Sequence, residues 1–314
     1  MTDVLTFGEA LVTLRAEQSI RNGGSLRMSV AGAEVNVAIG LARLGHDVRW
    51  VGCTSRDEFG ALVLRTLRAE NVDVGHAELV DEPTGLVVFE PRIADLTRVS
   101  YRRSGSAGSR LAPTHVEASS EVRPRVVHLT GITAALGPGP LGAVRAAAEA
   151  AAASGATLCF DVNHRAKLWS REEAAAALRP LMGHVDILVA SDDELALAAP
   201  GGTTEDERVE ALLEAGVREI VVKRGADGAQ VFDVSGAAVA RPALSVPVKD
   251  TVGAGDAFVA GYLSALLDGE PVERRLERGV ALGAFAVASQ GDWEGLPVRD
   301  ELGLLDAAPG SAIR

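Results

Sequence analysis

The segment Asp250-Thr251-Val252-Gly253-Ala254-Gly255-Asp256-Ala257-Phe258 lies near the C-terminal end of the chain, directly before apolar residues at helical spacing. Its two glycines leave the backbone N–H groups of the predicted helix start uncovered. Free amides at the positive end of a helix dipole form an anion site that suits a phosphoryl group. Asp256 falls in the first turn, where its carboxylate could take a proton from an attacking hydroxyl. An ordinary glycine turn with an acidic first-turn residue has the same pattern.

Glycines and other small residues also occur in the segments before and after this helix. The predicted strand 219–223 ends in Lys223, and Arg224-Gly225-Ala226-Asp227-Gly228 then turns the chain into a second strand at 229–234. Such a turn fits beside a nucleotide, and a simple hairpin has the same pattern. The predicted helix 280–289 consists of small residues, which permit the approach of a flat group such as adenine or tight packing on a sheet.

Two polar clusters follow predicted strands farther from the segment. Asp161-Val162-Asn163-His164-Arg165 follows the strand 156–161, and Ser191-Asp192-Asp193-Glu194 follows the strand 185–190. Ligands bind beyond the carboxyl ends of parallel strands, so both clusters are expected at one crevice. The guanidinium of Arg165 can donate two parallel hydrogen bonds, so we expect it to bind a carboxylate or a phosphate. Ser191 and Glu194 also match an S-x-x-E capping box.

The first 70 residues predict alternating strands and helices, which indicates a parallel sheet with helices on its faces. In this part 48–53 is predicted as one strand. The pattern then changes to two strands at 84–90 and 97–103, of which the second places Tyr101 and Arg103 on one face. A solvated hairpin and a lid over a polar ligand both fit this pattern. The alternation of strands and helices resumes at residue 126.

Composition argues against several classes of protein. Asp and Glu outnumber Lys and Arg by 43 to 31, with the signs interspersed, so nucleic acid and anionic membranes are not expected partners. The acidic residues Asp3 and Glu9 argue against a signal peptide, and no stretch approaches the roughly 18 apolar residues of a membrane span. Cys53 and Cys159 lie in predicted strands without metal-ligand spacing. We therefore expect a cytoplasmic protein with buried thiols and no metal held by its side chains.

Two segments resemble the signatures of a known family. Asp250 to Asp256 is similar to the C-terminal signature of ribokinase-like (pfkB-type) carbohydrate kinases, and Gly32-Ala33-Glu34-Val35-Asn36-Val37-Ala38 is similar to their N-terminal signature. The resemblance covers essentially the whole chain. It implies one ribokinase-like three-layer α/β/α domain over 1–314, with a central, mostly parallel sheet and a small β-sheet lid from about 11–29 and 84–104. It also implies ATP as the phosphoryl donor, Mg²⁺, and Asp256 as general base.

Within this family the sequence most resembles the kinases of 2-keto-3-deoxygluconate, a sugar acid. The segments that carry this likeness are Tyr101 to Ser109, Asp161 to Arg165, Leu168-Trp169-Ser170 and Gly291-Asp292-Trp293-Glu294-Gly295. The resemblance implies that the sugar acid contacts Gly32, Asn36, Tyr101, Arg103, Arg165 and Asp292, together with the catalytic Asp256. It implies that ATP contacts Asn163, Ser191, Lys223, Gly225, Asp227, Gly228 and the segment Gly253-Ala254-Gly255, whose amides form an anion hole.

The expected reaction is phosphorylation of 2-dehydro-3-deoxy-D-gluconate to its 6-phosphate, and Arg103 and Arg165 would balance the substrate carboxylate. Ser191 stands where many relatives have the Asn of an Asn-x-x-Glu motif, and sugar-acid kinases often have Ser. Val87 stands where some relatives have Tyr, which leaves the sugar epimer open. The alternatives are a kinase for fructose, ribose or a different keto-deoxy acid, and a non-catalytic sensor. By analogy with paired lid sheets, a homo-oligomer is expected.

Overall fold

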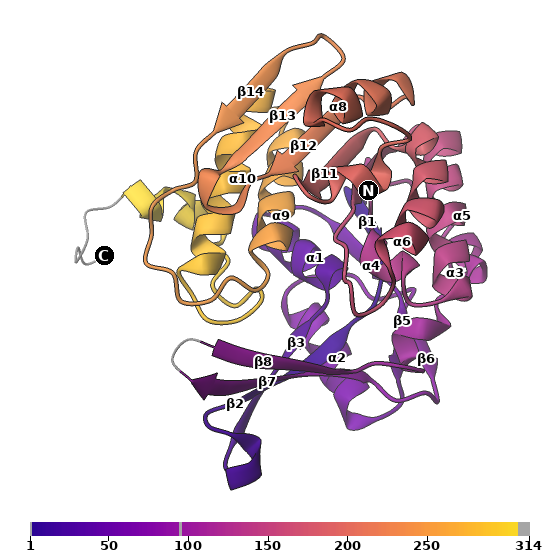
Figure 1. Cartoon of the computed structure of the whole chain (residues 1–314). Coiled ribbons are helices and arrows are strands. Elements are labelled where there is room, and N and C mark those ends of the chain that lie inside the picture. The colour runs from indigo at the N-terminus through magenta and orange to yellow at the C-terminus, as the bar shows by residue number, and fades with distance from the viewer. Residues whose placement is uncertain (1, 94–95, 307–314) are drawn as a thin grey trace.

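An eight-stranded sheet forms the centre of the molecule (Figure 1). The computed structural model describes residues 2–93 and 96–306. The spatial order of the strands is β14 (Ala238–Arg241), β13 (Ala229–Asp233), β12 (Glu219–Lys223), β11 (Ile187–Ser191), β10 (Thr157–Asp161), β9 (Val126–Thr130), β1 (Val4–Phe7) and β4 (Val48–Val51). The six strands from β12 to β4 are parallel, and β13 and β14 continue the sheet in antiparallel pairing.

Helices cover both faces of this sheet and form two hydrophobic cores. One core contains side chains of α1 (Ala33–Arg43), α2 (Glu58–Ala69), α9 (Ala254–Leu267) and α10 (Val272–Val287). The other contains side chains of α3 (Pro113–Ala118), α4 (Gly131–Ala134), α5 (Pro138–Ser154), α6 (Arg171–Leu178), α7 (Leu195–Ala198) and α8 (Glu205–Glu214). Successive strand residues alternate between the cores: Cys159 belongs to the first, Leu158 and Phe160 to the second.

The order of the strands creates a crevice at one end of the sheet. From β1 the chain continues to β4 on one side, and it later returns to β9 on the other side of β1. Such a reversal of strand order leaves space beyond the carboxyl ends of the strands, where ligands bind in open α/β sheets.

A second sheet lies beside this end of the molecule (Figure 1). It contains four strands in the order β3 (Leu26–Ala31), β2 (Leu11–Ala16), β7 (Gly85–Ile93) and β8 (Leu96–Arg102). Strand β2 follows β1 after a few residues, so the second sheet starts from the carboxyl end of β1. A third, two-stranded sheet pairs β5 (Cys53–Ser55) with β6 (Glu78–Val80). The 3₁₀ segments are η1 (Ile20–Asn22), η2 (Ala107–Arg110), η3 (Arg179–His184), η4 (Gly225–Asp227) and η5 (Arg299–Asp306).

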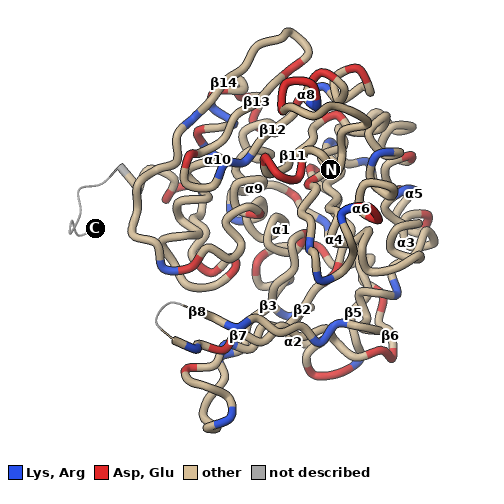
Figure 2. Tube along the Cα trace, viewed as in Figure 1, with Lys and Arg blue, Asp and Glu red and all other residues tan. Residues whose placement is uncertain are grey.

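The predicted fold class is confirmed, because helices lie on both faces of a mostly parallel sheet and a small separate sheet accompanies it. The prediction of one strand over 48–53 is wrong. Gly52 separates β4 from β5, and a Cβ atom at Gly52 would lie 2.4 Å from the Gly8 carbonyl oxygen, so only glycine lets the chain change sheets there. Basic and acidic residues are interspersed along the chain (Figure 2). Across residues 2–93 and 96–306, no helix is long and apolar enough to cross a membrane.

Candidate active site

The first turn of α9 carries Asp256 and unpaired backbone amides. Gly253 precedes the helix with φ +76°, a left-handed conformation that favours glycine. A Cβ atom at this position would lie 2.1 Å from the carbonyl oxygen of Asp292. Within the described part of the chain, the N–H groups of Gly255 and Asp256 donate no backbone hydrogen bond. The helix start therefore offers donors to an anion.

Two asparagines hold the carboxylate of Asp256 in place. Asn36 Nδ2 donates to one oxygen at 2.8 Å, and Asn163 Nδ2 donates to the other at 3.3 Å. Asn163 is one of two non-glycine residues with positive φ in the described structure, at +38°, which indicates that the turn after β10 is shaped to deliver its side chain. Burial raises the pKa of Asp256 to about 6, and the hydrogen bond from Asn36 opposes the shift. At neutral pH the carboxylate is therefore charged, and its pKa lies close to the operating pH, as suits a general base.

A lysine bound to a buried carboxylate lies beside this helix start. Lys223 at the end of β12 places Nζ 2.8 and 3.0 Å from the two carboxylate oxygens of Asp161 at the end of β10. Burial opposes the charged form of Lys223, but Asp161 outweighs it and raises the lysine pKa. A Cβ atom at Gly255 would lie 3.4 Å from the same Nζ. A fixed cation and the free amides of α9 thus face the same space.

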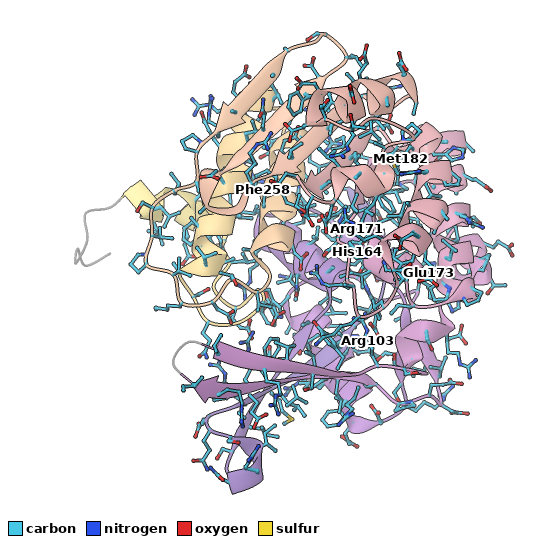
Figure 3. All side chains as sticks on the ribbon, in the orientation of Figure 1. Arg103, His164, Arg171, Glu173, Met182 and Phe258 are labelled. Atoms are coloured by element: carbon cyan, nitrogen blue, oxygen red, sulfur yellow. The ribbon has the colours of Figure 1, made fainter. Side chains whose placement is uncertain are left out.

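Two adjoining cavities meet at Asp256. The larger has a volume of about 1070 Å³ and the smaller about 90 Å³. Both are lined by Tyr101, Arg103, Arg165, Gly253 and Asp256, so residues of the second sheet and of the large sheet share their walls. Figure 3 shows Arg103 between the second sheet and the helices that cover the large sheet. The larger cavity also contains Asn163, Ser191 and Lys223; the smaller also contains Gly32, Asn36 and Asp292.

The two arginines of the cavities differ in their partners. Arg103 forms a hydrogen-bonded ion pair with the buried carboxylate of Glu9, so its charge is balanced inside the protein. Arg165 donates to the backbone oxygen of His164 and pairs with no carboxylate among residues 2–93 and 96–306. Among the described residues, Arg165 is thus the cavity arginine without a carboxylate partner, whereas Arg103 is already paired with one.

Asp292 ties the smaller cavity to the second sheet. Arg15 of β2 lies 3.2 Å from Asp292 and 2.8 Å from Asp250, and its guanidinium stacks 4.1 Å from the ring centre of Phe89. Burial raises the pKa of Asp292 to about 7 despite this arginine. Gly32 also lines the smaller cavity. Its φ is +147°, and a Cβ atom at this position would lie 2.2 Å from the Glu9 carbonyl oxygen.

The remaining predicted residues do not line either cavity. Gly225, Asp227 and Gly228 form the 3₁₀ turn after Lys223, and neither cavity includes them or Ala254. The predicted capping box is half present. Glu194 accepts the N–H of Ser191 at 2.9 Å and that of His164 at 2.7 Å, but the Ser191 hydroxyl donates to Asp193 instead of capping the helix. Glu194 therefore joins the two predicted polar clusters.

Sequence reasoning missed Glu9, Arg15 and the pairing of Asp161 with Lys223. The available signal for Glu9 was a carboxylate inside an apolar N-terminal run, because buried carboxylates need partners. Nothing local in the sequence connects Arg15 with Asp250 and Asp292, which lie more than two hundred residues away.

Comparisons with known proteins agree with this geometry. Residues 1–299 match the family model described as pfkB family carbohydrate kinase. The chain is 37% identical to the 2-dehydro-3-deoxygluconokinase of Thermoproteus tenax over 95% of this chain and 92% of the relative. It is 31% identical to the 2-dehydro-3-deoxygalactonokinase of Haloferax volcanii over 92% of each chain. It superposes with a TM-score of 0.87 on a putative ribokinase II from E. coli solved in complex with ATP and Mg²⁺, at 25% identity over 98% of this chain and 99% of that one.

Proposed function

Because this chain belongs to the pfkB family of carbohydrate kinases, we propose that it phosphorylates the sugar acid 2-dehydro-3-deoxy-D-gluconate at its terminal hydroxyl, with ATP as the donor. The observation that carries the proposal is the position of Asp256. Its carboxylate is held by two amides, beside free helix N–H groups, at the junction of two cavities that also contain Arg165. The enzyme is proposed to act in the cytoplasm as a homo-oligomer.

The proposed step is an in-line phosphoryl transfer. Asp256 accepts the proton of the substrate hydroxyl while the oxygen forms a bond to the γ-phosphorus, and the bond to the β-phosphate oxygen breaks to release ADP. The amides of Gly253, Gly255 and Asp256 stabilise the equatorial oxygens of the phosphoryl group. Lys223, held by Asp161, adds a fixed positive charge on the same side.

The larger cavity suits a nucleotide with its metal. It has the volume for a nucleotide, and the solved E. coli relative is named as an ATP and Mg²⁺ complex. Glu194 lines this cavity and is its only carboxylate besides Asp256 among the described residues, so it is the oxygen donor proposed to hold Mg²⁺. When bound, the ion neutralises phosphate charge. Asn163, Ser191 and the turn of Gly225, Asp227 and Gly228 are proposed to contact the nucleotide.

The smaller cavity is proposed to hold the sugar acid, with Gly32, Asn36 and Asp292 on one side and Tyr101 on the other. The second sheet, with the segments 11–29 and 84–104, is proposed to act as a lid that excludes water from the reacting atoms, all within one domain over 1–314. Tyr101 and Phe89 of this sheet line both cavities, which supports that role.

The test of the function is a coupled ADP-release screen with ATP and Mg²⁺. Sugar acids, including 2-dehydro-3-deoxygluconate and its galactonate epimer, are compared with fructose and ribose. The proposal expects kcat/KM to be highest for 2-dehydro-3-deoxygluconate. A higher value for the galactonate epimer, for fructose or for ribose would reassign the substrate, and the absence of ADP release with every acceptor would indicate a sensor.

The substitution Arg165→Leu should raise KM for the sugar acid by roughly 10- to 100-fold, because one charge-assisted hydrogen bond contributes about 1.5–3 kcal/mol. The KM for ATP should change much less. The control is Arg102→Leu, since Arg102 carries the same charge and belongs to β8 of the second sheet but lines neither cavity. Equal increases in both KM values would contradict a carboxylate contact at Arg165.

The pH dependence of kcat/KM should reveal the titration of Asp256. The charged form is the base, so activity should fall about tenfold per pH unit below the pKa of about 6. Asn36→Ala removes a hydrogen bond that lowers this pKa, and it should move the acid limb to higher pH. The nucleotide titrates identically in both enzymes, so an unmoved limb would show that another group controls the reaction.

A further inference from the structure

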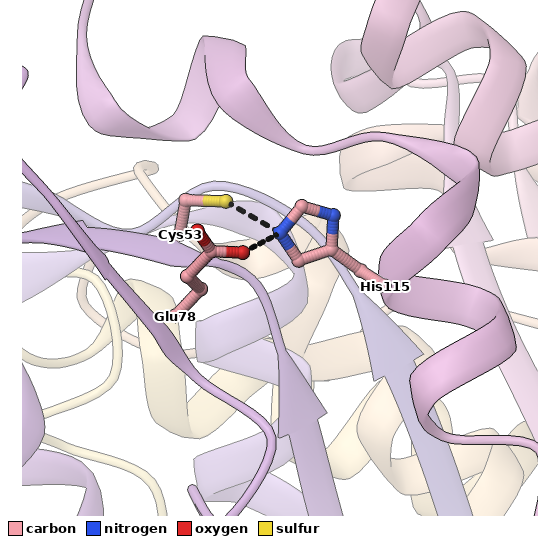
Figure 4. Close-up of side chains that lie close together, drawn as sticks. All are labelled: Cys53, Glu78 and His115. Carbon is pink, nitrogen blue, oxygen red and sulfur yellow. Dashed lines mark hydrogen bonds and ion pairs between the residues drawn. The ribbon is translucent and has the colours of Figure 1, made fainter.

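A cysteine, a histidine and a glutamate converge outside the kinase site (Figure 4). Cys53 and Glu78 are register partners in the parallel pair β5 and β6, so their side chains leave the small sheet side by side. His115 approaches them from the first turn of α3. The three residues are far apart in sequence, and none of them lines either cavity of the active site.

The contacts of His115 orient its Nε2 atom toward the other two side chains. Nε2 lies 3.2 Å from Cys53 Sγ and 2.8 Å from Glu78 Oε2. On the other side of the ring, Nδ1 accepts the N–H of Ala112 at 3.0 Å and lies 3.1 Å from the carbonyl oxygen of the same residue. The backbone therefore holds the imidazole from behind, and the Ala112 carbonyl oxygen lies where a protonated Nδ1 can donate to it, as the second nitrogen of a metal-bound histidine does.

We propose that Cys53, Glu78 and His115 form a Zn²⁺ site with one open coordination position. A thiolate, an imidazole and a carboxylate are the ligand types that Zn²⁺ combines, and three protein ligands leave a fourth position for water. Tetrahedral Zn²⁺ would separate neighbouring ligand atoms by about 3.4–3.6 Å. His115 Nε2 lies closer than this to both other ligand atoms, at 3.2 Å from Sγ and 2.8 Å from Oε2, and the side chain of Glu78 is 59% exposed, which leaves room for it to move outward.

The proton balance follows from the contacts of His115. Without metal, Nδ1 accepts a hydrogen bond and Nε2 carries the proton, which points to Glu78 and Cys53. On binding, Nε2 gives up its proton and donates its lone pair to the metal, while Nδ1 takes a proton and donates it to the Ala112 oxygen. The Cys53 thiol becomes a thiolate, so one proton leaves per ion bound.

The thiol proton makes binding dependent on pH. Burial, with the nearby carboxylates of Glu78 and Glu82, raises the pKa of Cys53 to about 12. Because one proton leaves per ion bound, the affinity for Zn²⁺ should rise with pH. The same buried thiol should react slowly with alkylating agents when metal is absent.

Equilibrium dialysis of Zn²⁺ against the full chain without nucleotide tests the site. The wild type should bind one ion per chain. Cys53→Ser and Glu78→Ala should each weaken this binding, and the loss of the thiolate should cost roughly 100-fold or more, since changes behind the ligands alone cost 10- to 100-fold. Cys159→Ser is the matched control, because Cys159 is the other buried cysteine and lies in β10, away from the cluster.

Co²⁺ provides an independent readout. A near-ultraviolet band for charge transfer from thiolate to Co²⁺ should appear with the wild type and with Cys159→Ser, and it should be absent with Cys53→Ser. Glu78 is exposed, so Glu78→Ala answers the question even if Cys53→Ser does not fold. The proposal is overturned if the wild type takes up no Zn²⁺, if Cys53→Ser and Glu78→Ala bind like the wild type, or if the band is missing.

Discussion

Asp256→Asn should lower kcat by roughly 10²- to 10⁴-fold while the affinities for ATP and for the sugar acid stay close to those of the wild type. The amide has the shape of the carboxylate and still accepts a hydrogen bond from Asn36, but it cannot take the hydroxyl proton. Single-turnover kinetics with saturating substrates, together with equilibrium binding of each substrate, measure the two effects separately. A turnover within a few-fold of the wild type would show that Asp256 is not the base.

Asp268→Asn is the matched control, because Asp268 lies at the opposite end of α9. Although burial opposes it, the hydrogen bonds from Arg299 and Arg278 lower the pKa of Asp268 to about 2. Its charge therefore stabilises the fold above the unfolded pKa, and this stability is lost as the pH falls through the folded pKa. At neutral pH, Asp268→Asn should be less stable but active, whereas Asp256→Asn should be inactive without loss of stability, because the pKa of Asp256 is raised.

Gly253→Ala should have the second largest effect, a loss of roughly 10²- to 10³-fold in kcat. Its Cβ atom would overlap the Asp292 carbonyl oxygen, at 2.1 Å, so the start of α9 must shift. The shift moves the amides of Gly255 and Asp256 away from the transferred phosphoryl group. Thermal unfolding and steady-state kinetics on the same samples measure the effects on stability and on activity.

Gly269→Ala is the control that separates the cost of a left-handed alanine from the effect of displacing the start of α9. Gly269 has φ +78° against +76° for Gly253, but no atom lies within 4 Å of the Cβ it would gain. It should therefore cost only the conformational strain of a left-handed alanine, about 1–2 kcal/mol, with kcat unchanged. If Gly253→Ala also kept its kcat, the amides at the start of α9 would not be part of the catalytic machinery.

Local patterns predicted the fold and the polar edge of the large sheet. The strands are short apolar runs, and the clusters after β10 and β11 follow directly from where those runs end. Because parallel strands share one edge, the prediction that 161–165 and 191–194 meet is confirmed by the bond between Glu194 and the His164 amide. The helix start at Gly253 was readable because apolar residues at helical spacing directly follow the two glycines.

Contacts between distant segments could not be predicted. Arg103 was expected to balance the substrate carboxylate, and its ion pair with Glu9 was not foreseen, because only the folded chain brings the two together. Cys53 was judged by its spacing from Cys159, whereas its neighbours are Glu78 and His115 from other elements. The sequence indicated that Arg103 is polar and that Cys53 is buried. It did not indicate their partners, because these come from elements that only the folded chain brings together.

The ion pairs of Arg15 have a consequence for the rate of product release. Arg15 of the second sheet contacts Asp250 and Asp292, which lie outside that sheet, so the proposed opening of the lid would separate its guanidinium from both carboxyl groups and expose them to water. Dissolved ions weaken such attractions. Added salt should therefore speed the opening of the lid and shorten the time for which product is retained. In the absence of added salt, the ion pairs of Arg15 slow this opening and so limit turnover.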